Sequence, residues 1–197
     1  MERPFSPSCE RNREPIFDVL RDHLPASGLL LEIGSGTGQH GAYFAPSFPG
    51  ITWQTSDRAE HHDGIRAWVE WASAPNLRPP LPLDVNDDPW PLASCQAVFT
   101  ANTTHYMAWP SAQALLRGVA RVLTPGGRFV LYGPFNYGGR FTSESNARFD
   151  LWLKERDPSF GVRDAEAVVG ILDAGGLTLL EDRAMPANNR CMVFERG

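Results

Sequence analysis

Short apolar runs alternate along this chain with segments whose apolar residues recur at helical spacing. The run 29–33 reads LLLEI and leads into glycines, which is typical of a buried parallel strand. Similar runs predict further strands over 51–56, 81–85, 97–101 and 128–132. Helical spacing predicts helices over 14–24 (Pro15 in the first turn), 40–48, 58–72, 111–123 (Ser111 as N-cap), 143–155 and 164–174.

The order of these elements predicts the architecture. Strand and helix alternate five times, which indicates a doubly wound parallel sheet with right-handed crossovers. Two final strand-like runs, 177–183 and 191–195, are joined by a connection too short for a parallel crossover, so they form an antiparallel hairpin. We expect an α/β, Rossmann-like sheet of seven strands in one domain, 1–197, in which residues 1–27 cap the site. Ligands of such sheets bind beyond the carboxyl ends of the strands.

Composition narrows the functional classes. The 197 residues are 42% hydrophobic and 21% charged, which is ordinary globular usage. The net charge of -5 argues against a nucleic-acid partner, because such binding needs a basic face. Three widely separated cysteines make no disulfide framework, and the polar N-terminus and the short apolar runs suggest neither a signal peptide nor a membrane span. We therefore expect a cytoplasmic protein with no membrane partner.

A dense glycine loop follows the first predicted strand. Glycines stand at 34, 36 and 38, preceded by Glu32. Glycine lets the backbone turn tightly and approach a ligand. Gln39 occupies the position where the dinucleotide fingerprint requires glycine, which disfavours a nicotinamide dehydrogenase, and no Lys-Ser/Thr pair marks a phosphate loop. The pattern fits a ligand with a cationic amino-acid end, although a strand-helix turn without a ligand remains the alternative.

Two acids follow the next two predicted strands. Asp57 lies 19 residues beyond Gly38, close to the ~20-residue spacing of an acid that accepts ribose hydroxyls. It could also simply cap the following helix. Asp84 could accept from an adenine amine while Val85 flanks the ring, or it could be an ordinary turn residue. Segment 123–127 (LTPGG) precedes the fifth strand as a further recurring turn.

Together these motifs resemble the class I S-adenosylmethionine-dependent methyltransferases over about residues 28–197. The resemblance implies S-adenosyl-L-methionine as cofactor. It places the methionine moiety on the loop, the ribose at Asp57, the adenine at Asp84 and the sulfonium near the turn after the fourth strand. The expected cofactor-binding residues are Arg13, Glu32, Gly34, Ser35, Gly36, Thr37, Gly38, Asp57, Arg58, Asp84, Val85, Asn102 and Thr103.

A narrower resemblance is nearly full-length. The chain is similar to a family of short methyltransferase-like proteins that includes methyltransferase-like protein 26. The matching segments are CERNREPI, SGTGQH, the pair Asn102 and His105, YGPFNYGG, SESNARFD, GVRD and MPANN. The segment 9–13 could be a polar helix cap, or it could fold over the cofactor mouth with Arg11 or Arg13 pairing a carboxylate.

Catalytic candidates follow from position. His105 stands after the fourth strand, where a base could reach an acceptor, or it could only hydrogen-bond the loop. Tyr106 could orient an acceptor or pack. Asn136 and Tyr137, after the fifth strand, could form an acceptor wall or an ordinary surface turn. His61 and His62 lack metal-ligand spacing, so no metal is expected, and no Cys-His pair is indicated.

The leading hypothesis is methyl transfer to an O, N or S atom of a small molecule by in-line displacement in a desolvated pocket. The alternative is a cofactor-binding, non-catalytic regulatory or scaffold protein with the same fold. The expected partner is a small-molecule methyl acceptor, and the chain would be a monomer or homodimer.

Overall fold

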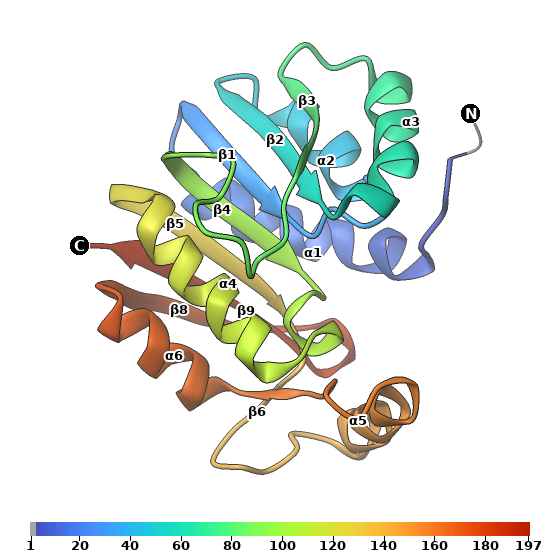
Figure 1. The fold of residues 1–197 in the computed structure, drawn as a ribbon, viewed down its shortest axis with the longest axis vertical. Helices are drawn as coiled ribbons and strands as arrows, with labels where there is room; N and C mark the ends of the chain where they lie inside the picture. Colours follow the sequence, from blue (N-terminus) through green and yellow to red (C-terminus); the bar gives the residue numbers. More distant parts are fainter. Residues whose placement is uncertain (1–2) are drawn as a thin grey trace.

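The computed structural model describes residues 3–197, and positions 1 and 2 of the expected domain lie outside the described residues. Nine strand segments and six α-helices follow one another (Figure 1). The helices are α1 Pro7–His23, α2 Gln39–Phe44, α3 His62–Ala72, α4 Trp109–Val122, α5 Glu144–Arg156 and α6 Ala165–Ala174. The strands are β1 Gly28–Ile33, β2 Ile51–Asp57, β3 Leu77–Pro82, β4 Cys95–Ala101, β5 Leu123–Gly133, β6 Phe135–Asn136, β7 Arg163–Asp164, β8 Leu177–Met185 and β9 Asn189–Arg196.

The predicted seven-stranded sheet is confirmed. Its order is β3-β2-β1-β4-β5-β9-β8, and β1 to β5 pair in parallel. The strand β9 runs antiparallel between β5 and β8. The strand order reverses between β1 and β4, because the chain runs outward from β1 through β2 to β3 and then crosses back to β4 on the other side of β1. Open α/β sheets bind ligands at such a switch point.

Helices cover both faces of the sheet (Figure 1). On one face, α1 and α2 pack over a core that includes Leu30, Trp53 and Phe99. On the other, α4 and α6 pack over Leu31, Phe129 and their neighbours. Alternate residues of each strand therefore enter opposite cores, which is why the central strands read as continuous apolar runs.

The predicted start of the first helix is wrong. The helix α1 begins at Pro7 rather than at position 14, so segment 9–13 is helical and Pro15 lies inside the helix. Pro7 stands in the first turn, where its missing N–H costs nothing. The buried stripe of α1 includes the polar Asn12 together with Ile16, Val19 and Leu20, and this polar member hid the helical period.

Three further boundaries differ from the predictions. The third strand occupies Leu77–Pro82 rather than 81–85, and it carries three prolines because it lies at the edge of the sheet. The helix α4 is preceded by Ala108 as N-cap, so Ser111 lies within its first turn and caps nothing. The predicted 40–48 helix is α-helical only to Phe44 and continues as a 3-10 turn, Ala45–Ser47.

One helix covers neither face. The helix α5 lies beyond the carboxyl end of the sheet (Figure 1). In the chain it follows the short strand β6 and precedes β7, and these two strands pair with each other in parallel. Ser143 caps it by accepting a hydrogen bond from the Asn146 amide, with N···O 3.1 Å. The helix thus forms a wall over the edge where ligands are expected. Within residues 3–197 no helix combines the length and apolar character of a membrane span.

Candidate functional site

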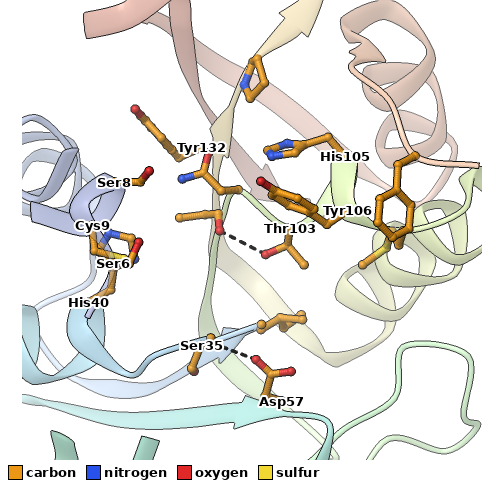
Figure 2. A pocket seen from close by; sticks show the side chains of 18 of the residues that line it. Ser6, Ser8, Cys9, Ser35, His40, Asp57, Thr103, His105, Tyr106 and Tyr132 are labelled. Carbon is orange, nitrogen blue, oxygen red and sulfur yellow. Dashed lines mark hydrogen bonds between the residues drawn. The ribbon is translucent and has the colours of Figure 1, made fainter. Parts of the chain in front are cut away.

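A cavity of about 1280 Å³ opens at the carboxyl ends of the parallel strands. Its floor is the glycine loop after β1 and the turn after β4, and its walls come from α1, α5 and the connection before β9. Figure 2 shows the side chains converging on the space between Ser35, Asp57, His105 and Tyr132. Segments far apart in the sequence thus meet in one place.

The glycine loop can follow its path only because its turning residues lack side chains. Gly34 has φ 69°, and a Cβ there would lie 2.8 Å from Thr103 Oγ1. Gly38 has φ 90°, and its Cβ would lie 2.9 Å from the Cα of Ile65 on α3. At Gly36 a Cβ would meet only the Gly34 carbonyl oxygen, at 4.0 Å, so open space lies beside this backbone. The loop presents bare backbone to the cavity.

Asp57 ties the loop to the end of β2. Its Oδ2 accepts from the Gly36 amide at 2.8 Å, and its Oδ1 accepts from the Arg58 amide at 2.8 Å. A carboxylate can accept about four hydrogen bonds, so Asp57 keeps capacity for a ligand diol. The capping alternative is wrong, because the N-cap positions of the next 3-10 turn and of α3 are Arg58 and His61 and neither helix start has a side-chain cap bond.

The predicted adenine-side residues lie in the same cavity. Asp84, Val85 and Arg58 all line it. One carboxylate oxygen of Asp84 accepts from the backbone amide and the side-chain amide of Asn86, at 2.9 and 2.8 Å. The Asp84 turn thus has an Asx geometry that holds the carboxylate at the rim. Leu83 and Val85 supply apolar surface on either side.

The turn after β4 forms the centre of the floor. Asn102 has φ 57°, a left-handed conformation that asparagine tolerates better than most residues. Its backbone N–H donates to the backbone carbonyl of Tyr132 on β5 at 2.9 Å. Thr103 Oγ1 accepts from Thr100 Oγ1 at 2.8 Å and donates to the Ala101 carbonyl at 3.2 Å. Both Asn102 and Thr103 line the cavity.

His105 is the most buried titratable group that lines the cavity, with 1% of its surface exposed. Burial, followed by the charge of Arg163, lowers the pKa of His105 to about 3. Its Nδ1 is buried and has no hydrogen-bond partner among residues 3–197. The ring points toward the space between Tyr132 and Tyr106 (Figure 2). A neutral imidazole here can accept or donate one hydrogen bond, but it carries no charge near pH 7.

Aromatic rings line the side of the cavity next to His105. Tyr106 lies 6.5 Å from Phe149 and 6.1 Å from Phe160, with interplanar angles of 78° and 82°. The His105 ring lies 5.3 Å from Phe149 at 75°. These near-perpendicular rings form a corner, and Tyr106 remains 42% exposed within it. Tyr106 thus packs against its neighbours and still keeps part of its ring open to the cavity.

The opposite wall is the first turns of α1. The Nε2 of His40 donates to Asn12 Oδ1 at 2.8 Å, and its Nδ1 faces the Cys9 thiol at 3.9 Å. Burial lowers the pKa of His40 to about 4 and raises that of Cys9, so both groups are neutral. The expectation that no Cys-His pair exists is wrong, because α2 brings His40 beside a helix that sequence spacing placed later. Burial also raises the pKa of Tyr132, on the same wall, to about 12.

Three predicted cofactor residues do not line the cavity. Glu32 lies beneath the loop, where its carboxylate accepts from Trp53 Nε1 at 2.8 Å. Burial raises its pKa to about 7. Gly38 packs against α3. Arg13 pairs with Glu10 on the outer side of α1, with its guanidinium 4.5 Å from the Tyr43 ring centre.

The outward position of Arg13 follows from the early start of α1. Residues two apart on an α-helix point about 200° apart, so the helix that turns Arg13 outward turns Arg11 inward. Arg11 lines the cavity. Its only side-chain partner in the described part of the chain is Ser8 Oγ, at 3.3 Å.

Two predicted catalytic residues are also placed elsewhere. Neither Asn136 nor Tyr137 lines the cavity, while Pro134 does. The Tyr137 hydroxyl donates to Asp182 Oδ2 at 2.6 Å, on the β8 side of the molecule. The prediction failed because the strand β6 continues the chain away from the carboxyl edge of the sheet before α5 returns to it. In residues 3–197, no group of three potential ligands could hold a metal ion.

Sequence reasoning did not single out many residues of the cavity lining, because helix starts, loops and the end of a strand from distant parts of the chain supply them. These residues share polar or small side chains, and they are Ser6, Ser8, Cys9, Asn12, His40, His61, Asn86, Ser145, Asn146, Ser159 and Asn189. The motif segments CERNREPI, SESNARFD and MPANN contain several of them, so those segments were the available signal.

Comparison with solved structures supports the fold. The chain is similar to an O-methyltransferase family protein from Burkholderia thailandensis, with TM-score 0.81 and 17% identity over 93% of this chain and 56% of that one. It is similar to an O-methyltransferase family 2 protein from Planctomyces limnophilus in complex with apigenin, with TM-score 0.81 and 18% identity over 94% and 56%. CalO1, a methyltransferase in calicheamicin biosynthesis in its SAH-bound form, gives TM-score 0.75 and 18% identity over 96% and 54%. This chain therefore spans about half the length of these structures.

A family model shows the family directly. The model described as protein of unknown function (DUF938) matches residues 3–196, which is nearly the whole chain. The chain belongs to the DUF938 family.

Proposed function

We propose that this protein is an S-adenosylmethionine-dependent methyltransferase that acts on a small molecule. One observation carries the proposal: the glycine loop, Asp57, Asp84 and Asn102 converge in a single cavity at the switch point of the sheet. Structures that share the fold include O-methyltransferases and an SAH-bound methyltransferase, which supports the same cofactor here. The resemblance to the methyltransferase-like protein 26 family points the same way.

The residues suit such a cofactor in chemical type. Bare loop backbone at Gly36 and the cation of Arg11 can hold an amino-acid end. Asp57 can accept two ribose hydroxyls, and Asp84 can accept from an exocyclic amine beside Leu83 and Val85. Bound here, the cofactor would supply an electrophilic methyl group. The residues 3–27 would cap this domain, since Ser6, Ser8 and Asn12 form one wall.

The protein contributes alignment, exclusion of water and a hydrogen bond to the acceptor. Methyl transfer requires a nucleophile in line behind the methyl group at ~3 Å, in a site that excludes water. His105 is neutral and buried beside the acceptor space, so it can hold the acceptor in place by a hydrogen bond. Tyr106 and Phe149 would provide the apolar surface for the acceptor.

Calorimetric titration with S-adenosylmethionine and S-adenosylhomocysteine tests the proposal. We expect binding by the wild type and a loss of at least tenfold in Asp57→Ala. Asp63→Ala is the matched control, because Asp63 is an exposed acid on α3 whose side chain pairs with Arg66. Absence of binding to the wild type at millimolar ligand would sink the proposal. Binding without turnover across phenols, amines and thiols would favour the regulatory alternative.

A further inference from the structure

The acceptor side of the cavity carries a feature that the cofactor does not explain. Tyr106, Phe149 and Phe160 present aromatic faces and edges toward a common space, and Tyr106 is the most exposed of the lining aromatic side chains. A core aromatic cluster would bury its rings. An exposed corner of near-perpendicular rings instead suits a planar ring that stacks on one member and meets the edge of another.

Two arginines lie close to this corner, and an acid that also lines the cavity, Asp157, accepts hydrogen bonds from the Ser159 amide and hydroxyl. Arg163 is half-buried behind His105, and its guanidinium donates to the carbonyls of Thr104, Met107 and Ser159. In residues 3–197 no carboxylate lies within ion-pair distance of it. Asp150, the acid that acts on Arg163 through its charge, is already bonded to Lys154 Nζ at 2.6 Å and to the Val162 amide at 2.9 Å.

A second cation supports the same side of the corner. The Arg156 guanidinium lies 3.1 Å from the Trp152 ring centre, and Trp152 in turn stacks on Phe149 at 5.6 Å. The positive charge of Arg156 also acts on Tyr106, where it opposes the effect of burial on the pKa of that hydroxyl. An aromatic corner backed by cations disfavours an ammonium guest and favours a group that develops negative charge.

From this arrangement we propose that the methyl acceptor is a planar aromatic molecule with an acidic hydroxyl, a phenol, held in the Tyr106–Phe149–Phe160 corner with its hydroxyl toward His105. The proposal rests on the methyltransferase function above. In the reaction, the phenol oxygen forms a bond to the methyl carbon while the carbon–sulfur bond breaks and its electron pair stays on sulfur. The phenol hydroxyl donates a hydrogen bond to the neutral His105 imidazole, its proton is released to solvent as the oxygen ionises, and the neutral thioether leaves. Arg163 acts as a positioning residue, because its field favours the ionised oxygen without touching it.

Binding of probes to the full chain tests the acceptor class, with and without S-adenosylhomocysteine. The probes are 2-naphthol, its saturated counterpart decahydro-2-naphthol, and a naphthylmethyl trimethylammonium salt. We expect 2-naphthol to bind about tenfold more tightly than the saturated alcohol, because ring contacts beyond area burial are lost in the latter. We expect the cation to bind more weakly still. Equal binding of both alcohols, or preference for the cation, would overturn the proposal.

Variants assign the effect to the corner. Tyr106→Leu should abolish the preference for the aromatic alcohol, while Phe141→Leu, at an exposed ring outside the cavity, should keep it. Retention of the preference in Tyr106→Leu would contradict the assignment. The absorbance of bound 4-nitrophenol reports its ionisation, and its pKa should be higher in Arg163→Gln than in the wild type. If that variant does not fold, the comparison of 2-naphthol with the trimethylammonium salt on the wild type still tests whether the corner disfavours a cation.

Failure of the acceptor proposal is distinct from failure of the methyltransferase proposal. Titration with S-adenosylhomocysteine tests cofactor binding alone. Probe binding to the cofactor-free chain tests the aromatic corner alone. Cofactor binding together with no aromatic preference would leave the methyltransferase standing and remove the phenol. Aromatic preference without cofactor binding would leave a site for planar aromatic molecules and would remove both the methyltransferase and the role of the phenol as methyl acceptor.

Discussion

The Nε2 of His40 donates to Asn12 Oδ1 at 2.8 Å, and this bond joins α2 to α1 across the wall of the cavity. Both residues are buried, at 6% and 7% exposure, so water does not replace the partner readily. The bond also sets the tautomer of His40: an amide oxygen only accepts, so the proton lies on Nε2 and Nδ1 is left facing Cys9.

Asn12→Ala should therefore destabilise the fold. The change leaves the buried Nε2–H of His40 without its partner, which costs about 1–3 kcal/mol in free energy of unfolding. Urea denaturation measures the change. Asp18→Ala serves as the control, since its exposed pair with Arg21 should contribute less than about 1 kcal/mol. Equal stability of the two variants would show that the Asn12–His40 bond contributes little.

The buried Glu32 should make stability depend on pH. Its pKa is raised from 4.5 to about 7 by burial, so the folded state binds more protons than the unfolded state between these values. Stability then falls as the pH rises from about 4.5 to 7 and levels off above it. Glu32→Gln keeps an acceptor for Trp53 and removes the ionisation.

The measurement for Glu32 is urea unfolding of wild type and Glu32→Gln from pH 5 to pH 8. The variant should gain on the wild type as the pH rises, by about 1–3 kcal/mol at pH 8. Parallel curves for the two proteins across the whole range would show that Glu32 titrates normally in the fold.

Three glycines should respond differently to alanine. Gly38→Ala places a Cβ against the α3 backbone in a left-handed conformation, so we expect a loss of more than about 1 kcal/mol of stability. Gly36→Ala has open space but φ 58°, so it should fold, with weakened ligand binding at the loop. Gly170→Ala, inside α6 with nothing nearby, should gain about 0.5–1 kcal/mol.

Thermal melts and calorimetric titration of the three glycine variants check this order. A stable Gly38→Ala protein would mean that the loop can move away from Ile65, and the packing explanation for Gly38 would have to be dropped.

His105 should matter both for turnover and for acid stability. Once an acceptor is identified, His105→Ala should lower the turnover rate by about 10²-fold, because the acceptor loses the hydrogen bond that aligns it with the methyl group. Unchanged turnover would remove His105 from the reaction. Rates should be measured at saturating cofactor, so that weakened cofactor binding is not mistaken for lost chemistry.

The acid-stability effect of His105 has the opposite sign to that of Glu32. Its pKa is lowered from 6.5 to about 3, so the unfolded state binds more protons between these values and stability falls as the pH drops below about 6.5. His105→Gln should flatten this loss, while the exposed His61→Gln should leave it unchanged. Urea unfolding from pH 4 to pH 7 distinguishes the two variants.

Local pattern was sufficient for the sheet. The run at 29–33, the glycines after it and the short final connection correctly indicated parallel strands and an antiparallel hairpin. Pattern failed where a polar residue faces inward, as Asn12 does in α1, and where a strand at the sheet edge consists largely of proline, as β3 does. In both places tertiary packing overrode the local signal.

Part of the candidate site could likewise be read from local pattern, and the rest depended on tertiary packing. The loop glycines, Asp57, Asp84 and the turn at Asn102 were identifiable because strand ends in a parallel sheet share one edge, so sequence order alone brings them together.

What lies above that edge was decided only in three dimensions. The direction in which Arg11 and Arg13 point depends on where α1 starts, and the aromatic corner depends on how α5 returns over the sheet. The sequence by itself determined which edge of the sheet carries the candidate site, because the carboxyl ends of parallel strands share one edge. Long-range packing of helices, which has no local period, decided which side chains face it.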